Sequence, residues 1–190
     1  MKIDADGWLD TAAHIPSPNF DDRPDNETPS LVVIHNISLP PGEFGGNAVE
    51  ALFTNQLDWD THPYYQSIRG LTVSAHFFIR RDGELVQFVP CSRRAWHAGA
   101  SQWRGREKCN DFSIGIELEG TDDAPFTDAQ YIRLNQLLNI LKDAYPVQAV
   151  TGHSAIAPGR KTDPGPHFDW DRLDTPIPIH PAGSSRDQST

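Results

Sequence analysis

Two histidines in this sequence come directly after apolar runs that lead into loops rich in glycine or proline. His35 follows the run 31–34, and His153 follows the short stretch 149–152. A rigid scaffold presents chemistry where its strands feed into loops, so a sheet that joined these two ends would place two imidazoles side by side. A single histidine of this kind is more often a core residue bonded to a backbone carbonyl, whereas two in matching positions favour a metal site.

Asp163 supplies a third group that a metal ion could use. It lies ten residues after His153 and precedes a proline, which favours extended backbone and holds the carboxylate in one direction. Zinc accepts two neutral imidazoles and one carboxylate, and three protein ligands leave its fourth position for water. Such a zinc lowers the pKa of bound water to about 7. The spacing also occurs in unrelated chains, so by itself it does not decide between a metal site and two structural histidines.

Glu117 and Lys161 could supply the remaining groups of a hydrolytic site. Strand alternation puts Gly115, Glu117 and Glu119 on the face opposite the apolar residues of the same stretch. Beside a glycine, the Glu117 carboxylate could reach a zinc-bound water and accept its proton. The competing interpretation is a solvent-facing glutamate, which is the expectation for Glu119. Lys161 could stabilise an oxyanion from the loop that carries Asp163, and its alternative is a solvated loop lysine.

The other histidines carry weaker signals. His76 alternates with Phe78 in an apolar stretch, which is typical of a pocket residue or of a residue that supports a metal ligand. Trp96 and His97 could form a wall for a sugar or a peptide, although packing of the tryptophan over the sheet explains the pair equally well. The four histidines in irregular segments are assigned no role: His14, His62, His167 and His180.

Strands and helices must position these residues. Apolar runs predict strands over residues 31–35, 73–79, 84–89, 112–118 and 149–151. The Asp82-Gly83 pair predicts a tight hairpin turn between the second and third of them. Short helical segments are expected over residues 48–53 and 168–173.

A longer helix is predicted from Thr127 to a point before Pro146. Thr127 and Gln130 fit a capping box, and the leucines that follow recur at helical spacing, which predicts one core-facing stripe. Interspersed strands and helices predict an α/β or α+β fold, a sheet covered by helices.

The length and composition limit the function classes. A chain of 190 residues is expected to form one domain, here 1–174 with its core at about 30–173, after an irregular lead-in over 1–30. The Pro/Ser-rich stretch 175–190 is expected to be a disordered tail. The formal charge of −10 argues against a nucleic-acid or anionic-membrane partner. Two cysteines are too few for a disulfide scaffold. With no apolar span or signal-peptide pattern, a cytoplasmic monomer is expected.

Four segments of the chain resemble the bacterial AmpD-type N-acetylmuramoyl-L-alanine amidases, in the order of that family. They are Val33-Ile34-His35-Asn36 and the residues after it to 45, Arg94-Ala95-Trp96-His97-Ala98-Gly99, the stretch 109–121 around Ile116-Glu117-Leu118, and Lys161-Thr162-Asp163-Pro164-Gly165. The likeness extends over about residues 7–173, nearly the whole chain.

The resemblance implies a zinc amidase with a peptidoglycan-recognition-protein-like fold, a single domain with a mixed central sheet flanked by helices. The implied substrate is a cytosolic 1,6-anhydro-N-acetylmuramyl peptide from cell-wall recycling. The bond cut would join the lactyl group of the muramic acid to L-alanine. By removing anhydromuropeptides, such an enzyme would also affect β-lactamase induction.

The resemblance also assigns roles to individual residues. It implies that His35, His153 and Asp163 bind Zn²⁺, that Glu117 accepts a proton and that Lys161 stabilises the transition state. The implied substrate contacts are Asn36, Trp96, Lys108 and Ala157.

Three positions depart from the family pattern. Ala155 stands where the family commonly has aspartate, and Thr72 and Lys108 stand where some relatives have arginines that meet the stem-peptide carboxylate. Lys108 keeps the charge without the bidentate fork of arginine, so the peptide preference is expected to differ.

Two other function classes remain open at this stage. A binding module could keep the groove of this fold without catalysis, although such proteins typically lack a complete ligand set. A cysteine amidase could use Cys109 or Cys91 with a histidine, but a small buried thiol is the commoner role of such residues.

Overall fold

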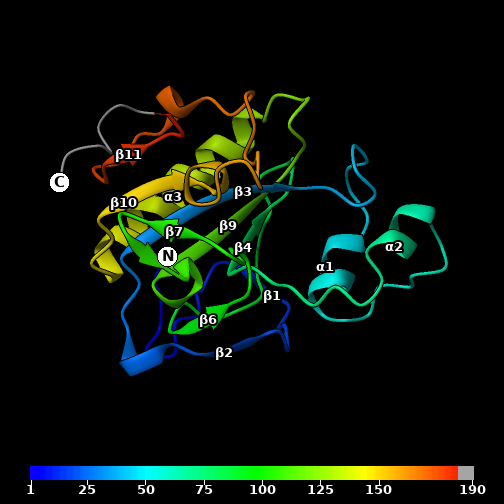
Figure 1. Ribbon diagram of the computed structural model, residues 1–190. Helices are drawn as coiled ribbons and strands as arrows, with labels where there is room; N and C mark the ends of the chain where they lie inside the picture. Colours follow the sequence, from blue (N-terminus) through cyan, green and yellow to red (C-terminus); the bar gives the residue numbers. More distant parts are fainter. Residues whose placement is uncertain (184–190) are drawn as a thin grey trace.

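A mixed seven-stranded sheet forms the centre of the computed structural model, which describes residues 1–183 (Figure 1). The strands lie in the order β1-β5-β4-β9-β3-β10-β11, and among them the β4–β5 pair is antiparallel while the other neighbours are parallel. Their bounds are Ala13–His14 (β1), Leu31–Ile37 (β3), Phe77–Ile79 (β4), Leu85–Gln87 (β5), Ser113–Glu119 (β9), Ala149–Gly152 (β10) and Ile179–His180 (β11).

Helices flank this sheet, as the sequence predicts. The long helix α3 crosses one face, whereas α1 and α2 lie together beyond one side of the sheet (Figure 1). The helices are α1 (Ala48–Phe53), α2 (Pro63–Ser67), α3 (Asp128–Ala144) and α4 (His153–Ile156), with 3-10 turns η1 (Pro24–Asn26), η2 (Cys109–Asp111) and η3 (Trp170–Arg172). Two small antiparallel pairs complete the fold: β2 (Phe20–Asp22) with β6 (Arg93–Ala95), and β7 (Gln102–Trp103) with β8 (Arg106–Glu107).

Helix α3 closes one face of the sheet with the leucine stripe that the spacing predicts. Leu134, Leu137, Leu138 and Leu141 are buried, and they pack in one cluster with Ile114, Ile116 and Leu118 of β9. The capping box is confirmed, since the Gln130 amide N–H donates to Thr127 Oγ1 (3.2 Å) and the Thr127 N–H donates to Gln130 Oε1 (3.0 Å). The apolar face of β9 is therefore held against the helix, and its other face is free for chemistry.

That second face brings the candidate residues of two strands together. Strands β3 and β9 are parallel, with Val33 opposite Gly115 and His35 opposite Glu117. Because alternate residues of a strand share a face, Ser113, Gly115 and Glu117 all lie on the side away from α3. The sheet thus sets His35 and Glu117 side by side.

Several expected boundaries are wrong. Strand β3 continues to Ile37 instead of ending at His35, and the strand expected over 73–79 begins only at Phe77. The late start of β4 follows from His76, because its side-chain Nδ1 accepts the hydrogen bond of the Gly115 N–H (3.0 Å) in place of a backbone carbonyl of the strand. The lead-in expected to be irregular also contains the short strands β1 and β2.

The tail expected from residue 175 is wrong for residues 175–183. Strand β11 pairs in parallel with β10, Ile177 is buried, and Thr151 Oγ1 donates to the His180 carbonyl (2.6 Å). The sheet edge of β10 and the apolar core at Ile177 outweigh the polar composition on which the expectation rested. Residues 184–190 of that stretch lie outside the described residues.

None of the helices formed by residues 1–183 has the length and apolar character needed to cross a bilayer.

Candidate active site

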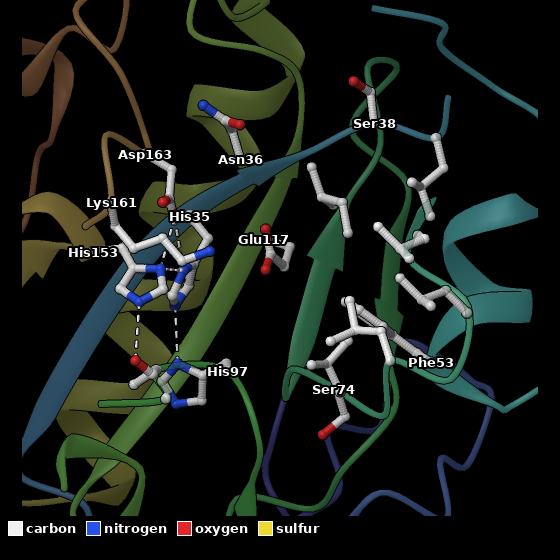
Figure 2. A pocket seen from close by; sticks show the side chains of 18 of the residues that line it. His35, Asn36, Ser38, Phe53, Ser74, His97, Glu117, His153, Lys161 and Asp163 are labelled. Carbon is white, nitrogen blue, oxygen red and sulfur yellow. Dashed lines mark hydrogen bonds and ion pairs between the residues drawn. The ribbon is translucent and has the colours of Figure 1, made fainter. Parts of the chain in front are cut away.

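His35, His153 and Asp163 converge on one point at the edge of the sheet (Figure 2). His35 belongs to β3, His153 opens α4 directly after β10, and Asp163 lies in the loop that follows α4. The two Nδ1 atoms are 3.0 Å apart, and Asp163 Oδ2 is 2.9 Å from the first and 3.0 Å from the second. Three ligand atoms thus form a nearly equilateral triangle.

This triangle fits a small cation. Zinc bonds of about 2.0–2.2 Å in a tetrahedron place ligand atoms about 3.3 Å apart, so a few tenths of an ångström of expansion would suffice. The His153 Nε2 atom lies 3.1 Å from the Ala98 carbonyl, which can only accept a hydrogen bond. A His153 that carries its proton on Nε2 donates to this carbonyl and turns its Nδ1 lone pair towards the triangle, which is the form that a cation would bind.

The protonation equilibria also favour a cation. Burial lowers the pKa of His35 to about 4, although its contact with Asp163 opposes the shift. Burial would raise the pKa of Asp163, but its contacts with His153 and His35 outweigh burial and hold this pKa below the ordinary value. Metal ligands must be deprotonated, so neutral His35 and ionised Asp163 are the forms that bind.

Glu117 lies beside the triangle as a buried carboxylate. Its Oε2 atom is buried and has no hydrogen-bond partner among residues 1–183, and the carboxylate points towards the ligand cluster (Figure 2). Burial raises the pKa of Glu117 well above its usual range; the charge of Asp163 adds to this effect and that of Lys161 opposes it. A buried carboxylate of raised proton affinity is suited to accept and return a proton.

Lys161 approaches the same place from the loop that carries Asp163. It is exposed, lines the cavity in front of the triangle, and acts electrostatically on both His35 and Glu117. Glu119, by contrast, is buried and accepts hydrogen bonds from the Gly45 and Arg81 N–H groups, so the expectation of a solvent-facing residue is wrong.

A cavity of about 820 Å³ opens in front of these groups. The triangle, Glu117 and Lys161 form its polar end, and apolar side chains of the α1–α2 region line another part of it. Those apolar residues include Leu39, Leu52, Phe53, Ile68, Leu71 and Val73. Neither Cys91 nor Cys109 lines the cavity, and both are fully buried, which leaves no thiol positioned as a nucleophile there.

The predicted substrate contacts fall in different places. Asn36 and Trp96 line the cavity, as does Thr72. Lys108 is exposed and Ala157 is buried, and neither is among the residues that line the cavity. The Ala157 carbonyl instead accepts the N–H groups of Arg160 and Lys161 and so shapes the loop that carries the lysine.

His97 has a role that the sequence did not reveal. Its Nδ1 atom lies 2.9 Å from His35 Nε2, and its Nε2 atom lies 3.1 Å from Ser113 Oγ. The missing side chain of Gly115 makes room for the ring, because a Cβ there would lie 2.6 Å from His97 Nδ1. Gly115 was expected to leave room for Glu117 to reach a water, but it makes room for an imidazole instead. The position of a glycine two residues before Glu117, on the same face of the strand, is the sequence feature that could have indicated this ring.

Two further buried side chains, His76 and Arg23, lie behind His97. His76 donates from Nε2 to the Arg93 carbonyl (3.0 Å), and its ring centroid is 5.8 Å from that of His97. Arg23, in the lead-in expected to be irregular, is buried and donates to the carbonyls of Cys91, Asn110, Asp111 and Ser113. Burial lowers the pKa of Arg23 to about 10. Arg23 ties the lead-in to the loop that precedes β9.

Comparison with known families bears directly on this site. Residues 25–166 match the family model described as N-acetylmuramoyl-L-alanine amidase (Amidase_2), and this range contains all five residues of the polar end. The chain belongs to this amidase family. The resemblance expected from the sequence is therefore confirmed.

Individual amidases of known name and structure are also similar to the chain. It is 62% identical over 175 residues to the 1,6-anhydro-N-acetylmuramyl-L-alanine amidase AmpD of Citrobacter freundii, covering 91% of this chain and 93% of that one. A crystal structure of a selenomethionine AmpD derivative superimposes with a TM-score of 0.89 at 60% identity, over 91% of this chain and 97% of the other.

The fold extends to more distant proteins. Human PGRP-IβC, solved in complex with a glycosamyl muramyl pentapeptide, matches with a TM-score of 0.62 at 12% identity, over 90% of this chain and 99% of that one. At this identity the likeness concerns the fold alone, and it confirms the expected peptidoglycan-recognition-protein-like architecture.

Proposed function

We propose that this protein is a zinc-dependent amidase that hydrolyses the bond between the lactyl group of a 1,6-anhydro-N-acetylmuramyl residue and the L-alanine of its stem peptide. The convergence of His35 Nδ1, His153 Nδ1 and Asp163 Oδ2 within 3.0 Å of one another, at the polar end of a large cavity, is the observation that carries the proposal. The similarity to the 1,6-anhydro-N-acetylmuramyl-L-alanine amidase AmpD supports the substrate class.

His35, His153 and Asp163 would hold the zinc ion, which when bound supplies Lewis-acid activation of water and of the scissile carbonyl. Glu117 accepts the proton of the attacking water and returns it to the leaving amine of L-alanine. Because its carboxylate is buried, and one of its oxygens accepts no hydrogen bond from the part of the chain that the structure describes, it can do so with little rearrangement of solvent. Lys161 places its ammonium where negative charge develops on the carbonyl oxygen.

The cavity suits a substrate with a sugar and a short peptide. Its volume of about 820 Å³ lies within the range of about 300–1,000 Å³ typical of ligand sites. Asn36 uses both amide protons internally, donating to Asp122 Oδ1 (2.8 Å) and to the Pro164 carbonyl (3.0 Å), so it would offer its carbonyl oxygen to the substrate. Trp96 would supply an aromatic wall, and the roles of Lys108 and Ala157 stay predictions.

The proposed reaction also implies a cellular role. We place the protein in the cytoplasm as a monomer that recycles cell-wall muropeptides and thereby affects β-lactamase induction indirectly. Its net charge of −10 is compatible with an anionic muropeptide, because a bound zinc ion would be the largest local charge.

The direct test incubates the purified protein with a defined 1,6-anhydro-N-acetylmuramyl tripeptide and analyses the products by mass spectrometry. Release of the free tripeptide, lost on chelation and restored by zinc, is the expected result. Glu117→Gln is expected to lower turnover by about 10²–10⁴-fold, and Lys161→Met by about 10²–10³-fold, with zinc still bound at one ion per chain in both variants.

Exposed residues outside the cavity provide matched controls. Glu107→Gln removes a carboxylate and Lys2→Met removes an ammonium, and neither residue lines the cavity. Both variants are expected to retain wild-type turnover. A zinc-free protein that binds the muropeptide without cleaving it would instead identify a binding module. Turnover that survives chelation would contradict the metal mechanism.

A further inference from the structure

The geometry behind the ligand triangle points to a hydrogen-bonded chain that fixes the tautomer of His35. We propose that Ser113 and His97 hold the proton of His35 on Nε2, so that its Nδ1 lone pair always faces the metal. The inference rests on the zinc site proposed above. His97 acts through His35 and is therefore a positioning residue.

The chain of hydrogen bonds has a defined direction at its inner end. Ser113 Oγ lies 2.5 Å from the Cys109 carbonyl, which can only accept, so the hydroxyl proton is committed there. Ser113 Oγ must then accept from His97 Nε2, 3.1 Å away. A neutral His97 with its proton on Nε2 has a lone pair on Nδ1, and this atom accepts from His35 Nε2 at 2.9 Å.

The outer end of the chain demands the same arrangement. A His35 that binds zinc through Nδ1 keeps a proton on Nε2, which needs an acceptor because the ring is buried. If His97 carried its proton on Nδ1 instead, two N–H groups would face each other across 2.9 Å. Both ends therefore select one pattern of protons.

Two further residues hold His97 in this position. Gly115 leaves the space that the ring occupies, because a methyl group at residue 115 would overlap the ring atoms. Asn110 Oδ1 accepts the backbone N–H groups of His97 (3.1 Å) and Ala98 (2.8 Å). The adjacent residues 97 and 98 thus supply the outer partners of both histidines, the ring for His35 and the Ala98 carbonyl for His153.

The two histidines differ in a way that makes the proposal testable. The partner of His153 is a backbone carbonyl, which a substitution does not remove, whereas the partner of His35 is a side chain. His97→Leu keeps an apolar side chain of similar size but removes the acceptor. His97→Asn loses bulk but retains an oxygen close to the position of Nδ1.

Zinc affinity is measured by competition with a chromophoric chelator, with zinc as the only ligand. His97→Leu is expected to bind zinc about 10–100-fold more weakly than the wild type, and His97→Asn within about threefold of it. Ser113→Ala, which frees the proton of His97 to move to Nδ1, is expected to fall between them. A role in packing alone predicts the opposite order for the leucine and asparagine variants.

Nitrogen-15 NMR of the imidazoles in the zinc-loaded wild type reads the tautomers directly. The expected result is a proton on Nε2 of both His35 and His97. The proposal is overturned if His97 carries its proton on Nδ1, or if His97→Leu binds zinc as tightly as His97→Asn. A wild type that binds no zinc overturns the proposed function instead. Circular dichroism checks folding, and if His97→Leu does not fold, Ser113→Ala and the NMR result decide.

Discussion

Replacing Gly115 by alanine tests the packing on which the site depends. The backbone of Gly115 does not adopt the left-handed conformation, so without a clash alanine would stabilise the fold by about 0.4–1 kcal/mol. The new Cβ, however, would lie 2.6 Å from His97 Nδ1 and 2.7 Å from His97 Cδ2. Carbon atoms in good contact are about 3.5–4.0 Å apart, so one of the two groups must move by about 1 Å.

The strand is less able to move than the ring. Strand β9 is hydrogen-bonded to β3 on one side and β4 on the other, and a shift of its backbone would strain both ladders. The His97 ring must therefore rotate away, which breaks its contacts with His35 and Ser113. Overpacking costs about 1–3 kcal/mol, so we expect Gly115→Ala to lower the free energy of unfolding by about 1–2 kcal/mol overall.

The assay combines urea unfolding of the metal-free protein with zinc competition. A second variant, His97→Ala, removes the ring, and in that background Gly115→Ala is expected to be neutral or stabilising. The double-mutant cycle should thus give a coupling energy of about 1–3 kcal/mol, as expected for residues in direct contact. We also expect Gly115→Ala to weaken zinc binding about 10-fold or more. If Gly115→Ala alone raises stability and leaves zinc affinity unchanged, the inferred packing is wrong.

Three further predictions concern the loss of stability at acid pH, the N-terminal cap of helix α3 and the two cysteine thiols. Burial lowers the pKa of His76 to about 3. Below about pH 6.5 the unfolded chain therefore takes up a proton at this histidine that the folded protein does not. The free energy of unfolding then falls by up to about 1.4 kcal/mol for each unit that the pH decreases. The variant His76→Asn keeps an acceptor for the Gly115 N–H. In urea unfolding between about pH 6.5 and about pH 4.5, it should reduce the slope of the free energy of unfolding against pH by the equivalent of about one proton; an unchanged slope would contradict the assignment. Thr127→Ala should cost about 1–2 kcal/mol and lower the melting temperature by about 2–8 °C, whereas Thr127→Ser should stay near the wild type. Cys91 and Cys109 are fully buried, and burial raises the pKa of Cys91 to about 12, so iodoacetamide should label them only in denaturant and leave activity intact; rapid native labelling with inactivation would revive a thiol mechanism.

Local patterns in the sequence predict those parts of the fold in which one short-range rule dominates. The capping box at Thr127 and the short helix α1 follow from neighbours a few residues apart. The alternation around Glu117 predicts correctly which residues of β9 pack against α3. His35 and His153 share a position at the end of an apolar run that leads into a loop, and the structure brings them together with Asp163.

The residues behind the ligands escape this reasoning because their partners are distant in the chain. His97 lies in a loop without periodicity, and its contacts with His35 and Ser113 span 62 and 16 residues. Arg23 lies in a proline-rich lead-in, yet its guanidinium is buried against carbonyls about 70–90 residues away. Strand β11 could not be predicted for the same reason. Its two residues are too few to show a strand pattern, and they form a strand only because they pair with β10.

The two faces of β9 link the packing of the core to the aim of the active site. Ser113, Gly115 and Glu117 are two residues apart, so one face of the strand anchors the ring of His97, makes room for it and presents the carboxylate. Between them, alternate residues lock the other face against α3. A shift of one residue in register would exchange the two faces and place Ile116 or Leu118, according to its direction, beside His35. The apolar residues that bury β9 against the helix therefore also decide that Glu117 faces the ligand triangle.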